Sequence, residues 1–172
     1  MSEHDILSII NTINLYGLAV DTQRWGLFDR IFTQDVDADF GETSHWRDLA
    51  SFKSDFAVFH DPFDSTQHIM MNHVVDVAGD LAHAFTYGSW RLIRRSVEGR
   101  PTWEGTGWYD DELMRRDARW LIKRRTCRIV WWDGNPLVQE TIPGVKFKLQ
   151  STVLRREASA GRVGFLNAVG TK

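Results

Sequence analysis

Apolar residues in the first part of the chain recur every three or four positions, the period of an amphipathic helix. One such stripe runs over residues 6–20, and a second, shorter one runs over residues 22–32. Residues 35–40 instead alternate strictly between aspartate and an apolar residue, which predicts a strand with one solvated face. The helical period then returns over residues 48–59 and predicts a third helix.

After residue 62 the period changes to two. Four strands are predicted, over residues 67–77, 82–95, 103–114 and 120–132, with short turns rich in Gly, Asp or Pro between them. Helices followed by a run of antiparallel strands are typical of the α+β class. We therefore expect one α+β domain over residues 1–133.

The last part of the chain, residues 134–172, is punctuated by Gly and Pro and is only weakly patterned. We interpret it as a C-terminal tail that packs on the domain or on a neighbouring subunit. A length of 172 residues fits about one domain with a core of its own.

The composition adds an aromatic interior to this picture. The chain has 8 Trp and 10 Phe but 3 Tyr, which suggests a deep apolar interior with a cavity lined by rings. The single cysteine, Cys127, excludes an internal disulfide framework and a multi-thiolate zinc site. Lys and Arg total 21 against 23 Asp and Glu, a net charge of −2, which argues against a nucleic-acid surface. The chain has no apolar run long enough to span a membrane and no signal peptide at its start, so we expect a cytoplasmic protein.

Two residues are candidates for proton chemistry. In the strand over 67–77, alternation places His68, Met70 and Asn72 on one face and His73 on the other. His68 is either an ordinary hydrogen-bonded histidine or a general base near neutral pH. Asp21, at the end of the first apolar stripe, is either the cap of the next helix or a carboxylate that orients a histidine.

A metal site is the other chemistry to weigh. His60, Asp61, Asp64, His68 and His73 lie close together in the sequence, and imidazole with carboxylate suits zinc or iron. However, the two strand histidines are an odd number of residues apart and are expected on opposite faces. We therefore expect no metal and no cofactor. The sequence also lacks a phosphate-binding Gly-rich loop and a Gly-x-Ser-x-Gly motif, and the basic runs at 94–95, 115–116 and 123–125 are interpreted as solvated faces.

Several segments together resemble one family. The first helix, with Asp21 four residues before Trp25 and with Phe28 following, resembles the first-helix signature of the SnoaL-like, nuclear transport factor two-like superfamily. Residues 66–68 (Thr-Gln-His) resemble the strand start that carries the catalytic histidine of scytalone dehydratase. The His-x-x-x-Asn spacing at 68–72 is similar to that of hexachlorocyclohexane dehydrochlorinase. Residues 107–120 resemble the Gly-x-Tyr strand, turn and Trp of the same superfamily.

This resemblance implies a fold and a set of roles. The fold would be a cone, a strongly curved mixed sheet wrapped over three N-terminal helices that encloses an apolar pocket. Asp21 would orient the base His68, with the two side chains in hydrogen-bond contact. Tyr16 stands where bile-acid 7α-dehydratase has an active-site tyrosine. The chain departs from scytalone dehydratase at Leu92, where a second histidine is expected, and near Gly107 and Tyr109, so scytalone is not the expected substrate.

The resemblance therefore implies a cofactor-free lyase that carries out a dehydratase-type elimination on a small apolar cyclic or aromatic substrate. An isomerase, cyclase or epoxide hydrolase on the same fold, or a non-catalytic small-molecule-binding or assembly module, stays open as an alternative. We expect a homo-oligomer, with a trimer slightly ahead of a dimer, and Trp108 packed against a partner subunit. The pocket is expected to exceed about 300 Å³. Its expected substrate-binding walls are Trp25, Phe28, Met70, Asn72, Phe85, Tyr109 and Trp131, of which Tyr109 points inward.

Overall fold

The computed structural model describes residues 3–145 and 151–170. The first half of this part of the chain is helical with one long and one very short strand, and the second half holds four long strands followed by short helices. The elements, in chain order, are α1 (Glu3–Asp21), η1 (Trp25–Arg30), β1 (Phe32–Asp39), β2 (His45–Trp46), α2 (Leu49–His60), β3 (Ser65–Ala78), β4 (Leu81–Ile93), β5 (Thr102–Arg116), β6 (Arg119–Gly134), η2 (Pro136–Gln139), α3 (Leu154–Ser159) and α4 (Gly164–Ala168).

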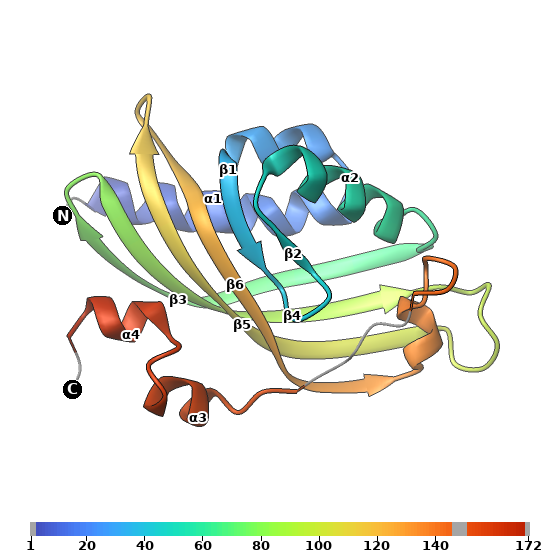
Figure 1. Ribbon diagram of the computed structural model, residues 1–172. Helices are drawn as coiled ribbons and strands as arrows, with labels where there is room; N and C mark the ends of the chain where they lie inside the picture. Colours follow the sequence, from blue (N-terminus) through green and yellow to red (C-terminus); the bar gives the residue numbers. More distant parts are fainter. Residues whose placement is uncertain (1–2, 146–150, 171–172) are drawn as a thin grey trace.

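The six strands form one curved, unclosed sheet in the order β2-β1-β6-β5-β4-β3 (Figure 1). β1 pairs with β6 in parallel, and every other neighbouring pair is antiparallel. The expected α+β class with a mixed sheet under N-terminal helices is therefore confirmed. The second of the three predicted helices is the short 3₁₀ helix η1, and the two-residue strand β2 lies between the predicted strand at 35–40 and the predicted helix at 48–59, where no element was predicted.

Helix α1 packs its apolar stripe into the sheet. Ile9, Ile13, Tyr16 and Val20 lie three or four residues apart and are at most 1% exposed. Gly17 lets α1 approach β3 closely, since a Cβ atom there would stand 3.1 Å from the carbonyl oxygen of His68. This contact sets the carboxyl end of α1 beside the start of β3.

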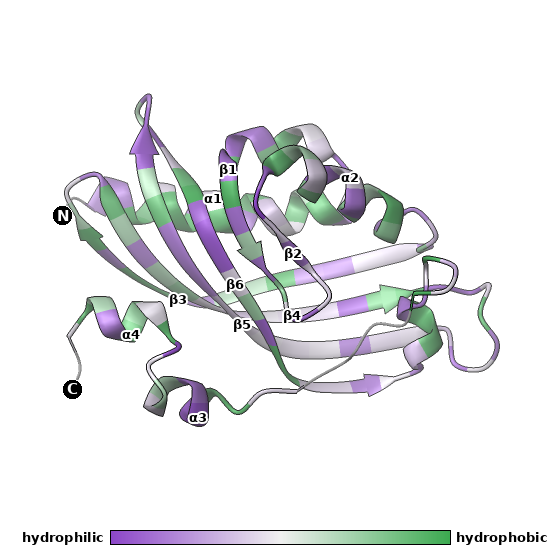
Figure 2. Ribbon diagram, viewed as in Figure 1, coloured by the Kyte–Doolittle hydropathy of each residue, from purple (hydrophilic) through white to green (hydrophobic). Residues whose placement is uncertain are grey.

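Helices η1 and α2 close the same side with aromatic rings. Asp48 caps α2 by accepting a hydrogen bond from the Ser51 amide at 2.8 Å. Phe28 of η1 and Phe52 and Phe56 of α2 then form one cluster, with ring centres 4.6–6.0 Å apart. Hydrophobic and hydrophilic positions are interleaved along α1 and α2 (Figure 2), as expected for helices with one buried face.

A β-bulge interrupts β3 and changes which side chains face inward. The register with β4 shifts between Met71 and Val74, and Asn72 adopts a left-handed backbone with φ +54°. Asn72 is therefore exposed, and the alternation resumes one residue out of phase. His73, expected to point away from the face of His68, instead contacts the buried Thr86 hydroxyl at 2.9 Å. The prediction for His73 was wrong, and so was that of a common face for His68 and Asn72.

The described part of the tail covers the part of the outer sheet face around Phe85 and Trp108. Val163, just before α4, buries Phe85 and Trp108, whose rings stack at 5.6 Å. The Asp110 carboxylate fixes this arrangement by accepting hydrogen bonds from the backbone amides of Gly164 and Phe165. Trp108 thus packs against its own chain where a partner subunit was expected. Residues 146–150 and 171–172 of the predicted tail lie outside the described residues.

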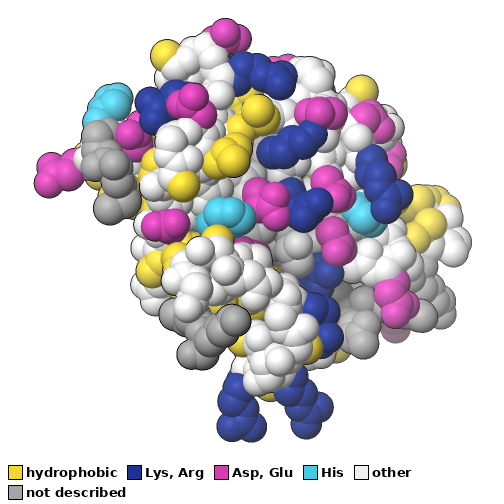
Figure 3. Space-filling view, turned by 60° about the vertical axis from the view of Figure 1, so that its left-hand side comes forward, with side chains coloured by type: hydrophobic (Ala, Val, Ile, Leu, Met, Phe, Trp, Pro, Cys, Tyr) yellow, Lys and Arg dark blue, Asp and Glu magenta, His cyan; other side chains and the backbone are white. Residues whose placement is uncertain are grey.

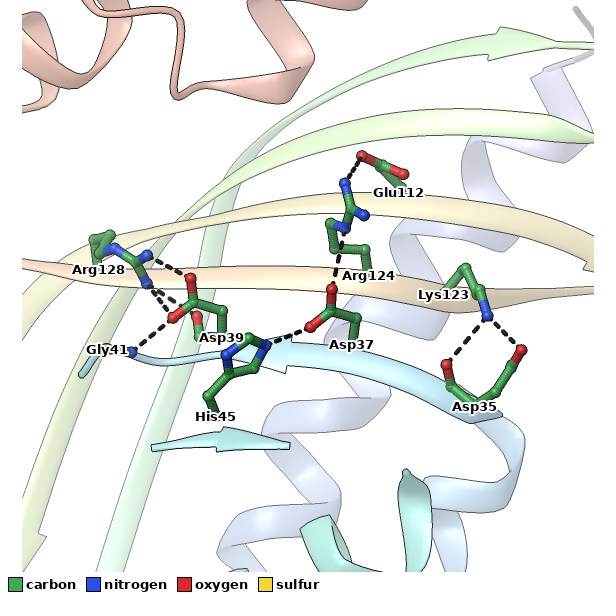
Figure 4. A network of polar contacts seen from close by, with 9 residues as sticks. All are labelled: Asp35, Asp37, Asp39, Gly41, His45, Glu112, Lys123, Arg124 and Arg128. Atoms are coloured by element: carbon green, nitrogen blue, oxygen red, sulfur yellow. Dashed lines mark hydrogen bonds and ion pairs between the residues drawn. The ribbon is translucent and has the colours of Figure 1, made fainter. Parts of the chain in front are cut away.

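Ion pairs cover the solvated face between β1 and β6. The alternating aspartates of β1 pair with basic residues of β6, Asp35 with Lys123, Asp37 with Arg124 and Asp39 with Arg128 (Figure 4). Acidic and basic side chains are interspersed on the face shown in Figure 3. Within residues 3–145 and 151–170, no helix combines the length and the apolar character that crossing a membrane requires.

Candidate active site

The carboxyl end of α1 and the start of β3 bring Asp21 and His68 together. Asp21 Oδ1 lies 2.7 Å from His68 Nδ1, and Asp21 Oδ2 accepts a hydrogen bond from the His68 amide at 2.8 Å. Thr66 donates its hydroxyl to Asp21 Oδ1, also at 2.8 Å. The contact expected between the two side chains is therefore present, and three hydrogen bonds hold the carboxylate in one orientation.

These contacts determine the charge of Asp21. Burial by itself would raise the pKa of this carboxyl group, but the hydrogen bonds and the positive potential from His68 outweigh burial, with a further hydrogen bond from Thr66, and the pKa is lowered. Asp21 is therefore an anion at neutral pH. It is not the cap of a second helix, since no side-chain hydrogen bond caps η1.

The carboxylate also fixes the tautomer of His68. An ionised carboxylate only accepts hydrogen bonds, so His68 Nδ1 carries the proton and Nε2 of the neutral ring carries the lone pair. The His68 side chain is 8% exposed, which places this lone pair in a largely dry interior. A protonated ring would be stabilised by Asp21, which is the arrangement a general base needs.

Two tyrosines lie next to this pair. The Tyr16 ring is 6.2 Å from the His68 ring and 5.7 Å from the Tyr109 ring. Trp90 donates its indole N–H to the Tyr109 oxygen at 2.7 Å. Burial raises the pKa of both tyrosines well above the usual value, so both remain protonated phenols at neutral pH.

A buried ion pair forms the other side of the tyrosine layer, and sequence reasoning missed it. Arg125 and Asp111 make two hydrogen bonds of 2.7 Å, and both side chains are fully buried. The Arg125 guanidinium lies 4.4 Å from the centre of the Tyr16 ring and 4.6 Å from that of Tyr109. Arg125 belongs to the basic run that was interpreted as a solvated face. The available signal was Asp111, an acidic residue among the alternate positions 103–113 of β5, which otherwise hold Trp, Gly, Gly, Tyr and Leu.

The expected wall residues divide into two groups. Tyr16, Phe28 and Tyr109 belong to the buried interior, and the half-buried Trp25 and Met70 pack against it. The predictions for Phe85 and Trp131 were wrong. Phe85 faces outward because the residues on either side of it in β4 face inward, and successive side chains of a strand point to opposite faces. Trp131 is 52% exposed because a bulge shifts the register of β6 against β5 between Thr106 and Gly107.

A cavity of about 820 Å³ lies beside the aromatic cluster of α2, with different walls from those expected. Phe40, Trp46, Phe56, Phe59 and Ile129 supply its apolar surface. Asp21, His68 and the predicted wall residues do not line it. Phe56 connects the two regions, since its ring contacts that of His60 at 5.1 Å and His60 in turn lies 6.2 Å from the His68 ring. The other lining residues are Asp39, Gly41, Glu42, Thr43, Ser44, His45, Asp55, Arg128, Gln139, Ile142, Val145, Thr152 and Glu157.

The residues weighed as metal ligands do not converge. His60 donates to a backbone carbonyl, His68 contacts Asp21, and His73 contacts Thr86. In the described part of the chain no three His, Cys, Asp or Glu side chains are grouped in a way that suits a metal ion.

Comparisons with known proteins agree with this architecture. A model of the SnoaL-like domain matches residues 2–126. A solved structure assigned as a scytalone dehydratase from Novosphingobium aromaticivorans superposes with a TM-score of 0.70 at 17% identity, over 86% of this chain and 91% of that one. A type 2 hexachlorocyclohexane dehydrochlorinase (LinA) gives a TM-score of 0.67 at 15% identity, over 84% and 93%.

A third similar structure is a protein described only as a member of the nuclear transport factor 2-like superfamily. The nuclear transport factor 2-like protein from Salmonella enterica serovar Typhimurium gives a TM-score of 0.61 at 17% identity, over 69% of this chain and 86% of that one. At these identities the superpositions show a common fold. Because the family model covers well over half of its residues, the chain belongs to the SnoaL-like domain family and has the nuclear transport factor 2-like fold.

Proposed function

We propose that the protein is a lyase that eliminates water from a small, largely apolar cyclic or aromatic substrate, with His68 as the general base. The observation that carries this proposal is the Asp21–His68 contact, which leaves a lone pair on His68 Nε2 and provides an anion to stabilise the imidazolium. Two of the structurally similar proteins, described as a scytalone dehydratase and a hexachlorocyclohexane dehydrochlorinase, have names that denote eliminations.

The reaction needs no group beyond these side chains to balance. His68 Nε2 takes a proton from a substrate carbon, and the electrons of that C–H bond form the new C=C bond as the bond to the hydroxyl breaks. The proton then leaves His68 with the departing hydroxide as water, which restores the neutral imidazole. Positioned proton transfer of this kind contributes about 10²–10⁴-fold to a rate.

Tyr16 fits the role of hydrogen-bond donor in this scheme. Its raised pKa makes it a poor acid but keeps its hydroxyl protonated, so it can donate to a developing oxyanion or to the leaving group. The Arg125 guanidinium against its ring favours negative charge in the same region.

Two further functions have support of their own. Isomerisation on the same base requires only that His68 return the proton to a different carbon of the substrate. Small-molecule binding without catalysis is favoured by the cavity of about 820 Å³, because His68 and Asp21 do not line it.

A single experiment separates these functions. Cyclic β-hydroxy carbonyl compounds are incubated with the protein and analysed by mass spectrometry. After chromatographic separation, elimination gives a product lighter by the mass of one water, isomerisation gives a new peak of unchanged mass, and a binder gives no new peak. We expect loss of water in the wild type and a rate at least about 10²-fold lower in His68→Ala and in Asp21→Asn.

Melting curves accompany every variant, and His4→Ala is the matched control because His4 is exposed in the first turn of α1. His4→Ala should retain the wild-type rate. Wild-type turnover in a folded His68→Ala protein would refute the proposed base.

A further inference from the structure

A second histidine, His60, lies between the cavity and His68. It is the last residue of α2 and is 3% exposed. Its ring lies 6.2 Å from the His68 ring, centre to centre. On its other sides it contacts aromatic rings at 5.0–5.7 Å, from Trp25, Phe56, Phe59 and Phe63. Phe56 and Phe59 also line the cavity, so His60 is the first polar side chain behind that wall.

The hydrogen bonding of His60 defines which nitrogen is available. His60 Nδ1 lies 2.7 Å from the carbonyl oxygen of Phe56, and a carbonyl only accepts, so Nδ1 carries the proton. Burial lowers the pKa of this imidazole to about 4, although the Phe56 carbonyl acts in the opposite direction. At neutral pH the ring is therefore uncharged, with a lone pair on Nε2.

This Nε2 atom has no hydrogen-bond partner within residues 3–145 and 151–170. It is also not among the fully enclosed side-chain atoms that lack a partner, so it keeps some accessible surface. His60 and His68 thus present two lone-pair nitrogens on neighbouring rings. Two acceptors cannot hydrogen-bond to each other, so neither Nε2 atom satisfies the other. Leaving a largely buried acceptor without a donor costs free energy.

We infer that His60 is a specificity-determining residue whose Nε2 accepts a hydrogen bond from a hydroxyl group of the substrate. The inference deepens the proposed function and rests on it, because it takes the space beside His68 as the substrate site. It narrows the substrate class to cyclic or aromatic compounds that carry a free hydroxyl group near the carbon that His68 deprotonates. His60 cannot donate to a leaving group, because its one proton is engaged by Phe56.

The test uses two small rings that differ in one group. p-Cresol carries a hydroxyl where p-xylene carries a methyl, and dissociation constants for both are measured by NMR titration. We expect the wild type to prefer p-cresol by about tenfold, the size of one net hydrogen bond to a buried neutral acceptor. In His60→Phe the preference should fall to about one or reverse, because the new ring fits among its aromatic neighbours but accepts no hydrogen bond.

Two controls locate the effect at His60. His4→Phe makes the same chemical change at an exposed position and should keep the preference. His68→Ala should also keep the preference for p-cresol. If His68→Ala lost this preference and His60→Phe kept it, the hydroxyl would bind His68 and the inference would be overturned.

A measurement on the wild type covers the case in which His60→Phe does not fold. In protein labelled with ¹⁵N-histidine, saturating p-cresol should shift the His60 Nε2 resonance, and p-xylene should not. An unchanged resonance, or no binding of p-cresol at millimolar concentration, would overturn the inference. Because these readouts measure binding, they are separate from the turnover of His68→Ala that tests the lyase.

Discussion

Three histidines face the interior of this protein, and their partners give them different chemistry. His68 contacts a carboxylate, His60 a backbone carbonyl and His73 a threonine hydroxyl. Of the three hydrogen-bond partners, only Asp21 is an anion that stabilises a protonated ring. The pairing of Asp21 with His68 could be predicted because both residues match one family pattern. The role of His60 could not, because it depends on a tautomer that only the contact with Phe56 reveals.

The burial of His60 predicts acid sensitivity. Its pKa of about 4 lies below the usual 6.5, so the unfolded chain takes up a proton first as the pH falls. The free energy of unfolding therefore decreases between about pH 6.5 and pH 4, by about 3 kcal/mol for this group. Urea unfolding of the wild type and of His60→Phe at pH 7 and pH 4 measures the difference. Equal pH dependence in the two proteins would contradict the prediction.

The buried Arg125–Asp111 pair predicts that removing one charge lowers the free energy of unfolding more than removing both. Asp111→Ala leaves a fully buried guanidinium without its anion and should lower the free energy of unfolding by about 3–5 kcal/mol. The double variant Asp111→Leu with Arg125→Met removes both charges and should cost less than the single one. Urea denaturation measures each value.

The exposed pair Arg91–Glu104 is the control for this comparison, and removing it by Glu104→Ala should cost at most about 1 kcal/mol. A double variant less stable than Asp111→Ala would contradict the prediction.

At the scale of the elements, the positions of the strands were predictable, but which of their side chains point inward was predictable only in part. Alternation gives the correct inward face for His68 and Met70, but it fails after the bulge at Asn72 and again at Trp131. A bulge adds one residue to one strand of a pair, and neither strand's own pattern shows which residue is added. The same holds for Arg125, which lies beyond a register shift between β5 and β6.

The left-handed backbone of Asn72 predicts that glycine at this strand position is more stable than valine. With φ at +54°, Asn72→Gly should be neutral or stabilising by up to about 1 kcal/mol, since glycine adopts this conformation without cost. Asn72→Val should destabilise by at least about 1–2 kcal/mol. Gln67, exposed on the same strand without positive φ, should show the reverse order, with valine more stable than glycine. Thermal unfolding of the four variants measures the relative stability of glycine and valine at each site. The same ranking at both sites would show that the bulge imposes no strain.

At the scale of the whole molecule, the sequence was sufficient for the class and order of the elements. Apolar periodicity locates α1, α2 and the four long strands, because each keeps its period over runs of several residues even where a bulge later shifts the phase. The cavity walls and the docking of the tail were not predictable, since both join residues far apart in the chain. Phe56 and Thr152 line one cavity, and Val163 covers Trp108. Asp110, which binds the start of α4, is adjacent to Asp111 but faces the other side of the sheet.

The outer face of the sheet predicts how copies of the protein associate. Trp131 is 52% exposed, and Tyr87 and Val130 are 41% and 39% exposed. Tyr87 and Val130 border a shallow depression of about 320 Å³ together with Thr106 of β5, whose partner in β6 is Trp131. A contiguous exposed apolar area of this kind is typical of a subunit interface. We therefore expect a homo-oligomer through this face.

Light scattering at micromolar concentration measures the mass of the assembly. Trp131→Glu places a charge in the expected interface and should shift the assembly toward monomer while leaving the melting of the fold nearly unchanged, because the side chain is half exposed in one chain. Leu7→Glu is the matched control, since Leu7 is 66% exposed on α1, away from this face. Its assembly should keep the wild-type mass. A monomeric wild type would show that the protein has no such interface. Dissociation by Leu7→Glu and not by Trp131→Glu would place the interface on another face. In either case the outer apolar residues would be ordinary exposed positions.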